Sequence, residues 1–104
     1  MAFRRVLART ELWPGEMVSL IIDDVPVLLV NIDDVVHAYE DRCAHQRARL
    51  SEGILDGCVL TCTAHGWSYD ASSGNGLNPD MVKLRKFAVR LCDNDILVDV
   101  GEAP

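Results

Sequence analysis

Residues 17–39 read MVSLIIDDVPVLLVNIDDVVHAY, and this stretch sets the expected fold. Its apolar runs are rich in β-branched and aliphatic residues and are separated by acidic pairs. Short runs of this kind are typical of strands, and paired aspartates are natural turn residues. The stretch therefore predicts successive short strands joined by solvated turns. The predicted strands are 17–22, 26–32 and 35–39, and the predicted turns are Asp23-Asp24 and Asp33-Asp34.

The C-terminal part of the chain alternates between apolar and polar positions. Phe87, Val89 and Leu91 fall on one face of a predicted strand, because successive side chains of a strand point to opposite faces. A turn at 93–95 leads into a second apolar strand at 96–100, so the two segments predict a terminal hairpin. No helix longer than a turn or two is predicted. Many short strands favour an all-β fold, a small antiparallel β-sandwich or barrel.

Length and composition limit the classes of protein to which the chain can belong. The 104 residues predict a single domain over residues 1–104. Apolar residues make up 49% and charged residues 25%, as in ordinary globular domains. A net charge of −6 argues against a partner that is nucleic acid. No targeting segment and no apolar run of the about 20 residues that a membrane span needs is visible. We expect a monomer in the cytoplasm.

Residues 41–80 do not follow the strand pattern and are predicted to be an insertion in the strand-rich base. Residues 41–57 and 70–80 are irregular and loop-like by composition, and a short apolar run at 58–62 lies between them. The insertion holds three of the four cysteines and two of the three histidines. It is therefore the predicted site of any metal chemistry.

Two Cys/His pairs stand out within this insertion. They read Cys43-Ala44-His45 and Cys62-Thr63-Ala64-His65, with sixteen residues between His45 and Cys62. Two thiolates and two imidazoles suit either zinc or an iron–sulfur cluster. Zinc fingers usually pair Cys with Cys and His with His, whereas a Rieske [2Fe–2S] cluster takes two Cys on one iron and two His on the other. One Cys and one His per loop lets each loop reach both irons.

The spacing C-x-H, sixteen residues, C-x-x-H resembles that of the Rieske-type ferredoxins. The stretch HGWSYD at 65–70 and the proline-containing stretch GNGLNP at 74–79 are also similar to that family. Within the family, the chain resembles the ferredoxin components of bacterial multicomponent diiron monooxygenases, the toluene 4-monooxygenase type. The segments that carry this closer resemblance are 13–17, 50–53 and 76–80.

The resemblance implies a Rieske fold that carries one [2Fe–2S] cluster on four ligands. Cys43 and Cys62 would bind one iron, and His45 and His65 would bind the other, with both imidazoles at the protein surface. Four further residues are implied to surround or shield the cluster: Gln46, Trp67, Tyr69 and Pro79.

Departures from the respiratory-type members of the family predict a low reduction potential. Those relatives have two further cysteines in the ligand loops, which form a disulfide, and a serine two residues after the second ligand histidine. This chain lacks those cysteines and has Trp67 at the position of the serine. Fewer hydrogen-bond donors to the cluster sulfurs lower the potential. Tyr69 keeps the position of the family's other hydroxyl donor.

The implied function is electron transfer rather than catalysis, because no nucleophile with a base and no nucleotide-binding loop is visible. The resemblance implies an NADH-dependent reductase with flavin and iron–sulfur centres as the donor, and a diiron hydroxylase as the acceptor. One alternative is a ferredoxin of a ring-hydroxylating dioxygenase system. Another is a structural zinc-binding module without redox chemistry.

The remaining residues that can take part in metal or proton chemistry receive simpler interpretations. Cys58 and Cys92 are predicted to be small buried side chains of strands, and His37 an ordinary half-buried strand residue. Arg42, Arg47 and Arg49 predict a basic tip beside the first Cys/His pair, with only Asp41 and Glu52 as acidic neighbours in sequence. The alternative is that these arginines simply pair with the two acids or keep the loop solvated.

Overall fold

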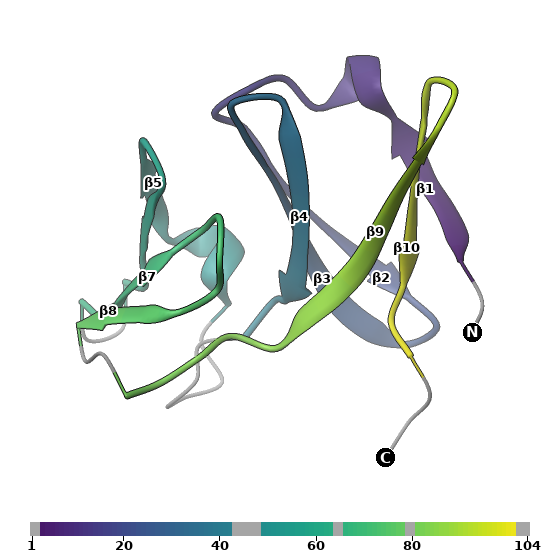
Figure 1. The fold of residues 1–104 in the computed structure, drawn as a ribbon. Coiled ribbons are helices and arrows are strands. Elements are labelled where there is room, and N and C mark those ends of the chain that lie inside the picture. Colours follow the sequence, from purple (N-terminus) through teal and green to yellow (C-terminus); the bar gives the residue numbers. More distant parts are fainter. Residues whose placement is uncertain (1–2, 43–48, 64–65, 79–80, 102–104) are drawn as a thin grey trace.

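The computed structural model describes residues 3–42, 49–63, 66–78 and 81–101. This part of the chain is built from strands and two single-turn 3-10 helices (Figure 1). The elements in chain order are β1 (Arg4–Ala8), η1 (Arg9–Glu11), β2 (Met17–Ile22), β3 (Val25–Ile32), β4 (Val35–Glu40), η2 (Leu50–Glu52), β5 (Ile54–Asp56), β6 (Val59–Thr61), β7 (Ser68–Asp70), β8 (Gly76–Asn78), β9 (Lys86–Cys92) and β10 (Asp95–Asp99).

Six strands form an antiparallel sheet in the order β1-β10-β9-β4-β3-β2. The sheet curls into a nearly closed barrel. Its two edge strands approach each other where Arg4 of β1 lies 3.3 Å from Asp23, directly after β2. The predicted all-β fold is confirmed. Among the described residues, no helix has the length and apolar character needed to cross a bilayer.

The paired aspartates form tight hairpin turns, as the sequence predicts. Asp23 and Asp24 have φ angles of 49° and 67°, and Asp33 and Asp34 have φ angles of 51° and 72°. Two-residue turns between antiparallel strands favour positive φ at both central positions, and Asp tolerates this conformation better than most residues do. The register continues directly across each turn, with Ile22 paired with Val25 in the first hairpin. These local turns therefore fix the pairing of β2, β3 and β4.

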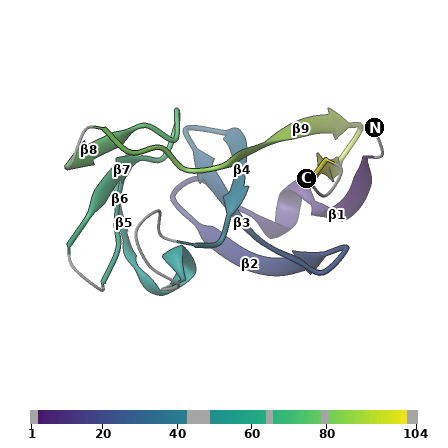
Figure 2. The same ribbon diagram turned by 90° about the horizontal axis from the view of Figure 1, so that it is seen from below.

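The second sheet is antiparallel, has the order β5-β6-β7-β8 and lies to one side of the barrel (Figure 2). The prediction of irregular chain over 41–57 and 70–80 is wrong in part, because η2, β5 and β8 lie in these segments. Each of these elements is only three residues long. A three-residue strand is too short to show a period, so only the pairing with neighbouring strands reveals it.

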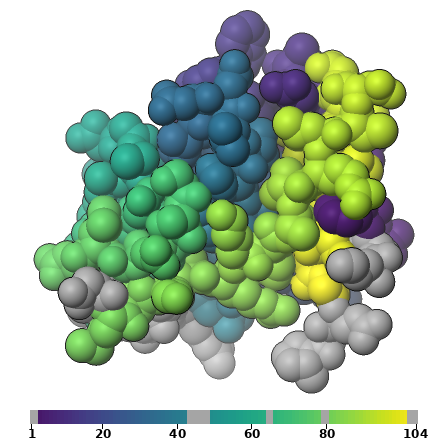
Figure 3. Space-filling view, in the orientation of Figure 1, coloured from purple at the N-terminus to yellow at the C-terminus, as the bar shows by residue number. Residues whose placement is uncertain are grey.

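Two apolar cores lie on opposite faces of β3. Val27 and Leu29 belong to the barrel core, whereas Leu28 and Val30 belong to a second core between the barrel and the small sheet. All four side chains are fully buried, which explains the unbroken apolar run in the sequence. Burial of each side chain of this size stabilises the fold by roughly 1.5–3 kcal/mol. Figure 3 shows the teal and green surface of the second sheet in contact with the blue surface of β4.

The terminal hairpin of β9 and β10 is confirmed, with Cys92 paired with Asp95 across the turn. The predicted apolar face of β9 is only partly buried. Phe87 lies in the barrel core and Val89 packs against it, but Leu91 is 41% exposed. The reason is that β9 pairs with β4 only near its start, and its far end extends beyond that neighbour.

Candidate metal centre

The structure describes one of the four predicted ligands, Cys62. Cys43, His45 and His65 lie outside the described residues, as do Gln46 and Pro79. Accordingly, no group of three or more potential metal ligands is found within the described ranges. The site is therefore built from Cys62 and from the contacts at the ends of the two ligand-bearing segments.

Cys62 follows β6 at the start of a tight loop. Its backbone N–H donates to the carbonyl oxygen of Trp67 at 2.7 Å, and its own carbonyl oxygen accepts from the N–H of Gly66 at 3.1 Å. Gly66 has a φ of +71°, the left-handed conformation that glycine adopts without strain. The strand pair formed by Thr61 and Ser68 continues beneath the loop. Cys62 and Trp67 are thus hydrogen-bonded neighbours at one end of the pair β6 and β7.

The side chain of Cys62 is fully buried and packs in the second core. Tyr69, on β7, is also fully buried there, and Trp67 packs against the same core while remaining partly exposed. The three predicted residues therefore lie on one short stretch of the small sheet. A thiolate ligand in such a position is shielded from water on the protein side.

A buried carboxylate holds the ends of the segment that carries the first Cys/His pair. Asp41 directly follows β4 and is 2% exposed. One carboxylate oxygen accepts from the backbone N–H of Ser51 at 2.8 Å. The other accepts from the hydroxyl groups of Ser51 and of Ser19 on β2, each at 2.7 Å. The N–H of Asp41 donates to the carbonyl oxygen of Pro26 at 2.9 Å.

The sequence interpretation missed this role of Asp41. Within the described residues, Asp41 pairs with serines and not with Arg42 or Arg49, and Arg42 instead lies 4.0 Å from Glu40. Aspartates are exposed far more often than buried, and Ser19 is 22 positions away. No local pattern therefore indicates the burial of this side chain. Arg49 is exposed, whereas Arg47 lies outside the described residues.

A close backbone contact joins η2 to the strand that leads to Cys62. Leu50 anchors η2 in the second core, where it is fully buried. Gly53, directly after η2, lies so close to β6 that a Cβ atom there would collide with the carbonyl oxygen of Thr61. Thr61 is the residue before Cys62. The exit of the first ligand segment and the entry of the second are therefore in direct contact.

Tyr39 attaches the opposite end of the small sheet to the barrel. Its hydroxyl donates to the carbonyl oxygen of Ala71 at 2.7 Å, and the ring packs against Gly74. Burial raises the pKa of Tyr39 well above its ordinary value, so the hydroxyl stays protonated. In the same region, hydrogen bonds from Ser72 lower the pKa of Asp70. The small sheet is thus attached to the barrel by a buried hydrogen bond at this end.

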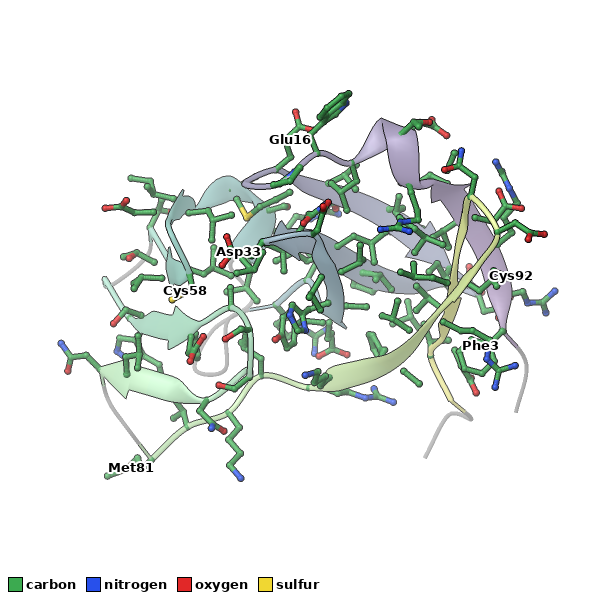
Figure 4. All side chains as sticks on the ribbon, turned by 45° about the horizontal axis from the view of Figure 1, so that its top comes forward. Phe3, Glu16, Asp33, Cys58, Met81 and Cys92 are labelled. Carbon is green, nitrogen blue, oxygen red and sulfur yellow. The ribbon has the colours of Figure 1, made fainter. Side chains whose placement is uncertain are left out.

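The two cysteines outside the Cys/His pairs do not occupy the predicted buried positions. Cys58 and Cys92 are both exposed, and Figure 4 shows them far apart on the molecule. Cys58 lies with Gly57 in the tight turn between β5 and β6, and Cys92 is the last residue of β9 before the turn. Their strand-like neighbours suggested burial, but turns place side chains in solvent. The half-buried position of His37 is confirmed.

The donor set and the environment of Cys62 fit an iron–sulfur cluster. Two thiolates and two imidazoles on two loops are the ligands of a Rieske centre. The one predicted ligand that the structure describes, Cys62, has a buried side chain, and its backbone is hydrogen-bonded to Gly66 and Trp67.

Comparison with known proteins identifies the family. The chain is 38% identical over 101 residues to the ferredoxin component of an alkene monooxygenase system from Xanthobacter autotrophicus, covering 95% of this chain and 82% of that protein. It is 35% identical to the ferredoxin component of biphenyl 2,3-dioxygenase from Rhodococcus jostii, with 96% and 94% covered. The structure of a complex of oxygenase and ferredoxin in carbazole 1,9a-dioxygenase contains a chain that matches with a TM-score of 0.83 at 31% identity, with 92% and 91% covered.

The family model that describes the Rieske [2Fe-2S] domain matches residues 3–88. This match spans the barrel strands β1 to β4, the whole small sheet and the start of β9. The chain therefore belongs to the Rieske [2Fe-2S] domain family, and its cofactor is one Rieske [2Fe–2S] cluster.

Proposed function

We propose that this protein carries single electrons to an oxygenase on its [2Fe–2S] cluster, with Cys43 and Cys62 as ligands of one iron and His45 and His65 as ligands of the other. The observation that carries the proposal is the paired C-x-H and C-x-x-H motif on a fold in which Cys62 is buried at the start of a closed loop. When bound, such a cluster supplies one-electron transfer. With four protein ligands, it offers no open iron position to a substrate.

Four residues complete the proposed surroundings of the cluster. Trp67 is partly exposed and lies two residues after the predicted ligand His65, so it shields one side of the loop from water. Tyr69 is buried on the next strand and keeps the position of a hydroxyl donor. Gln46 and Pro79 are the further residues that we assign to the surroundings of the cluster.

The finer proposal concerns the two redox partners. The acceptor that we favour is the diiron hydroxylase of an alkene or aromatic monooxygenase system, and the donor is an NADH-dependent reductase. The 38% identical relative named for an alkene monooxygenase system supports this acceptor. The second candidate is a ring-hydroxylating dioxygenase, favoured by the 35% identical biphenyl dioxygenase ferredoxin and by the carbazole dioxygenase complex.

Two measurements on the purified protein test the cofactor and its ligands. A red-brown spectrum that dithionite bleaches supports the iron–sulfur cluster, whereas a colourless protein with bound zinc contradicts it. Cys62→Ser is expected to abolish the visible spectrum, and Cys43→Ser is expected to do the same. Cys58→Ser is the matched control: its thiol is exposed on the same sheet, so the spectrum should stay unchanged. A full spectrum in both ligand variants would show that the assignment is wrong.

A reconstitution assay distinguishes the two acceptors. The reduced protein is mixed with a diiron hydroxylase from an alkene monooxygenase system or with the oxygenase of a biphenyl dioxygenase system. Oxidation of the cluster is followed by absorbance in each mixture. Fast oxidation only by the diiron hydroxylase supports the proposed acceptor. Fast oxidation only by the dioxygenase would replace it with the second candidate.

A further inference from the structure

The carboxylate of Asp41 is the most deeply buried charged group among the described residues, and it lies two residues before a predicted ligand. Burying a carboxylate costs free energy unless strong hydrogen bonds replace its water. Three donors do so within the described ranges: the N–H and hydroxyl of Ser51 and the hydroxyl of Ser19, all at 2.7 or 2.8 Å. Hydrogen bonds to a charged acceptor are the stronger ones in proteins.

These contacts join the two ends of one segment of chain. Asp41 precedes the segment that contains Cys43 and His45, and Ser51 follows it. Bonds to both carboxylate oxygens hold the exit of the segment against its entry. The bond to Ser19 on β2 also ties this point to the barrel. Holding the two ends of a segment together reduces the conformational freedom of the chain between them.

We propose that Asp41 is a positioning residue that closes the first ligand segment and thereby keeps the cluster bound. This inference rests on the proposed function, since it concerns retention of the [2Fe–2S] cluster. The effect extends to the second ligand segment through η2. Ser51 lies in η2, Gly53 directly after it packs on the carbonyl oxygen of Thr61, and Cys62 follows Thr61. Loss of the carboxylate therefore loosens the contact that relates the two Cys/His pairs.

Replacing a buried polar residue that has only a structural role should not affect cluster retention, and Asn31 provides this comparison. Asn31 is 4% exposed, donates from Nδ2 to the carbonyl oxygen of Leu12 at 2.9 Å, and accepts from the N–H of Asp34 at 2.9 Å. It lies in the barrel beside the turn between β3 and β4, whereas Asp41 follows the other end of β4. Replacing Asn31 should destabilise the barrel without reaching the ligand segments.

The experiment measures cluster loss from the holoprotein in wild type, Asp41→Ala, Asp41→Asn, Ser51→Ala and Asn31→Ala. Visible absorbance is followed in the presence of an iron chelator, over urea concentrations below those that unfold the protein. Far-UV circular dichroism gives the global stability of each variant. We expect Asp41→Ala to lose the cluster about tenfold faster than wild type, and Ser51→Ala about threefold faster. Asp41→Asn should lie between Ser51→Ala and Asp41→Ala, because its carbonyl oxygen still accepts one of the three bonds.

The dependence on urea separates local opening from unfolding. Local opening of one segment exposes little surface, so the logarithm of the loss rate should be nearly flat against urea. Asn31→Ala should be less stable than wild type but lose its cluster at the wild-type rate in low urea. A wild-type loss rate in Asp41→Ala would overturn the inference. So would a loss rate that rises with urea as steeply as global unfolding does.

Two further outcomes also decide whether the inference holds. If Asp41→Ala yields no folded protein, Ser51→Ala decides: faster loss supports the inference, and a wild-type rate overturns it. If wild-type protein itself has no [2Fe–2S] spectrum, the proposed function fails, which is a different result from an intact spectrum with unchanged retention in the variants.

Discussion

At the scale of single residues, His37 shows how neighbours from separate elements set a protonation state. His37 lies on β4, and its ring stacks on that of Tyr39 with centroids 6.4 Å apart. Burial lowers the pKa of His37, and the positive charge of Lys86 on β9 lowers it further. The negative charge of Asp70 on β7 acts in the opposite direction. The folded protein therefore favours neutral His37.

This preference predicts a loss of stability in acid that depends on His37. A histidine with a lowered folded pKa binds its proton more readily in the unfolded chain, whose pKa is about 6.5. The contribution of neutral His37 to the free energy of unfolding is fully present above that pH, and it is lost as the pH falls toward the folded pKa. Between about pH 7.5 and about pH 5.5, the free energy of unfolding measured with urea should therefore fall less in His37→Gln than in wild type. An equal loss in both proteins would exclude His37 as the cause.

Trp67 allows a second test at the same scale, concerning the reduction potential. The wild-type potential should fall in the lower part of the Rieske range of about −150 to +300 mV, because Trp67 has no hydroxyl to donate to a cluster sulfur. Trp67→Ser should raise the potential, and Trp67→Ala serves as its control because it removes the ring without adding a donor. Voltammetry of the three proteins measures the difference. Equal potentials in the Ser and Ala variants would contradict the donor argument.

At the scale of elements, the small sheet depends on one close contact between η2 and β6. Gly53 has an ordinary φ of −80°. Glycine is therefore needed at this position because it has no side chain, and not because of its backbone freedom. The carbonyl oxygen of Thr61 occupies the place of a Cβ atom. A rigid backbone atom cannot move aside as the end of a flexible side chain can. The two elements must separate if position 53 carries a larger residue.

Gly53→Ala is therefore expected to destabilise the protein by about 1–3 kcal/mol, the usual cost of overpacking. Gly57→Ala is the control, because Gly57 has a φ of +62° and a Cβ atom added there would meet no neighbouring atom within 4 Å. Its cost should be about 1–2 kcal/mol, from the left-handed backbone alone. Urea unfolding of both variants measures the two costs. A smaller effect at Gly53 than at Gly57 would show that the strands separate easily.

At the scale of the whole molecule, the charges at the ends of the first ligand segment are positive, although other exposed arginines and lysines lie on the barrel. The acidic pairs Asp23-Asp24 and Asp33-Asp34 are exposed in the turns of the barrel. Arg42 and Arg49 are exposed at the two ends of the first ligand segment. Arg42 lies near Glu40, while Arg49 makes no ion pair within the described ranges. If these arginines face the partner, we expect them to steer the protein toward an acidic surface on it.

Removal of the positive charge at Arg49 is expected to slow electron transfer to the proposed acceptor, the diiron hydroxylase, at low salt. Arg49→Gln, alone and together with Arg47→Gln, should lower the rate by up to about tenfold and flatten its dependence on salt. Arg9→Gln is the matched control: it removes the same charge near the turn between β3 and β4, at the other end of β4 from Asp41. Stopped-flow oxidation across a salt series measures both. Equal salt slopes in Arg49→Gln and wild type would contradict this docking role.

The amino-acid sequence alone is enough to predict the barrel strands β2, β3, β4, β9 and β10 and the ligand candidates, but β1 is not among the strands predicted from it. The turns at Asp23-Asp24 and Asp33-Asp34 depend on neighbouring residues only, so the hairpins that they join can be predicted from the chain. The Cys/His spacing is equally local, and the match to the Rieske [2Fe-2S] domain confirms the family that it indicated. The positions of Cys43, His45 and His65 remain predictions from that spacing.

Contacts made in the folded molecule decide which polar groups are buried and which thiols are exposed. Asp41 is buried because Ser19 and Ser51, 22 and 10 positions away, meet at its carboxylate. Cys58 is exposed because it lies in the hairpin turn that precedes β6, outside the paired strands. The physical reason is the same in both cases. Burial depends on contacts between residues distant in sequence, and a local pattern carries no information about them.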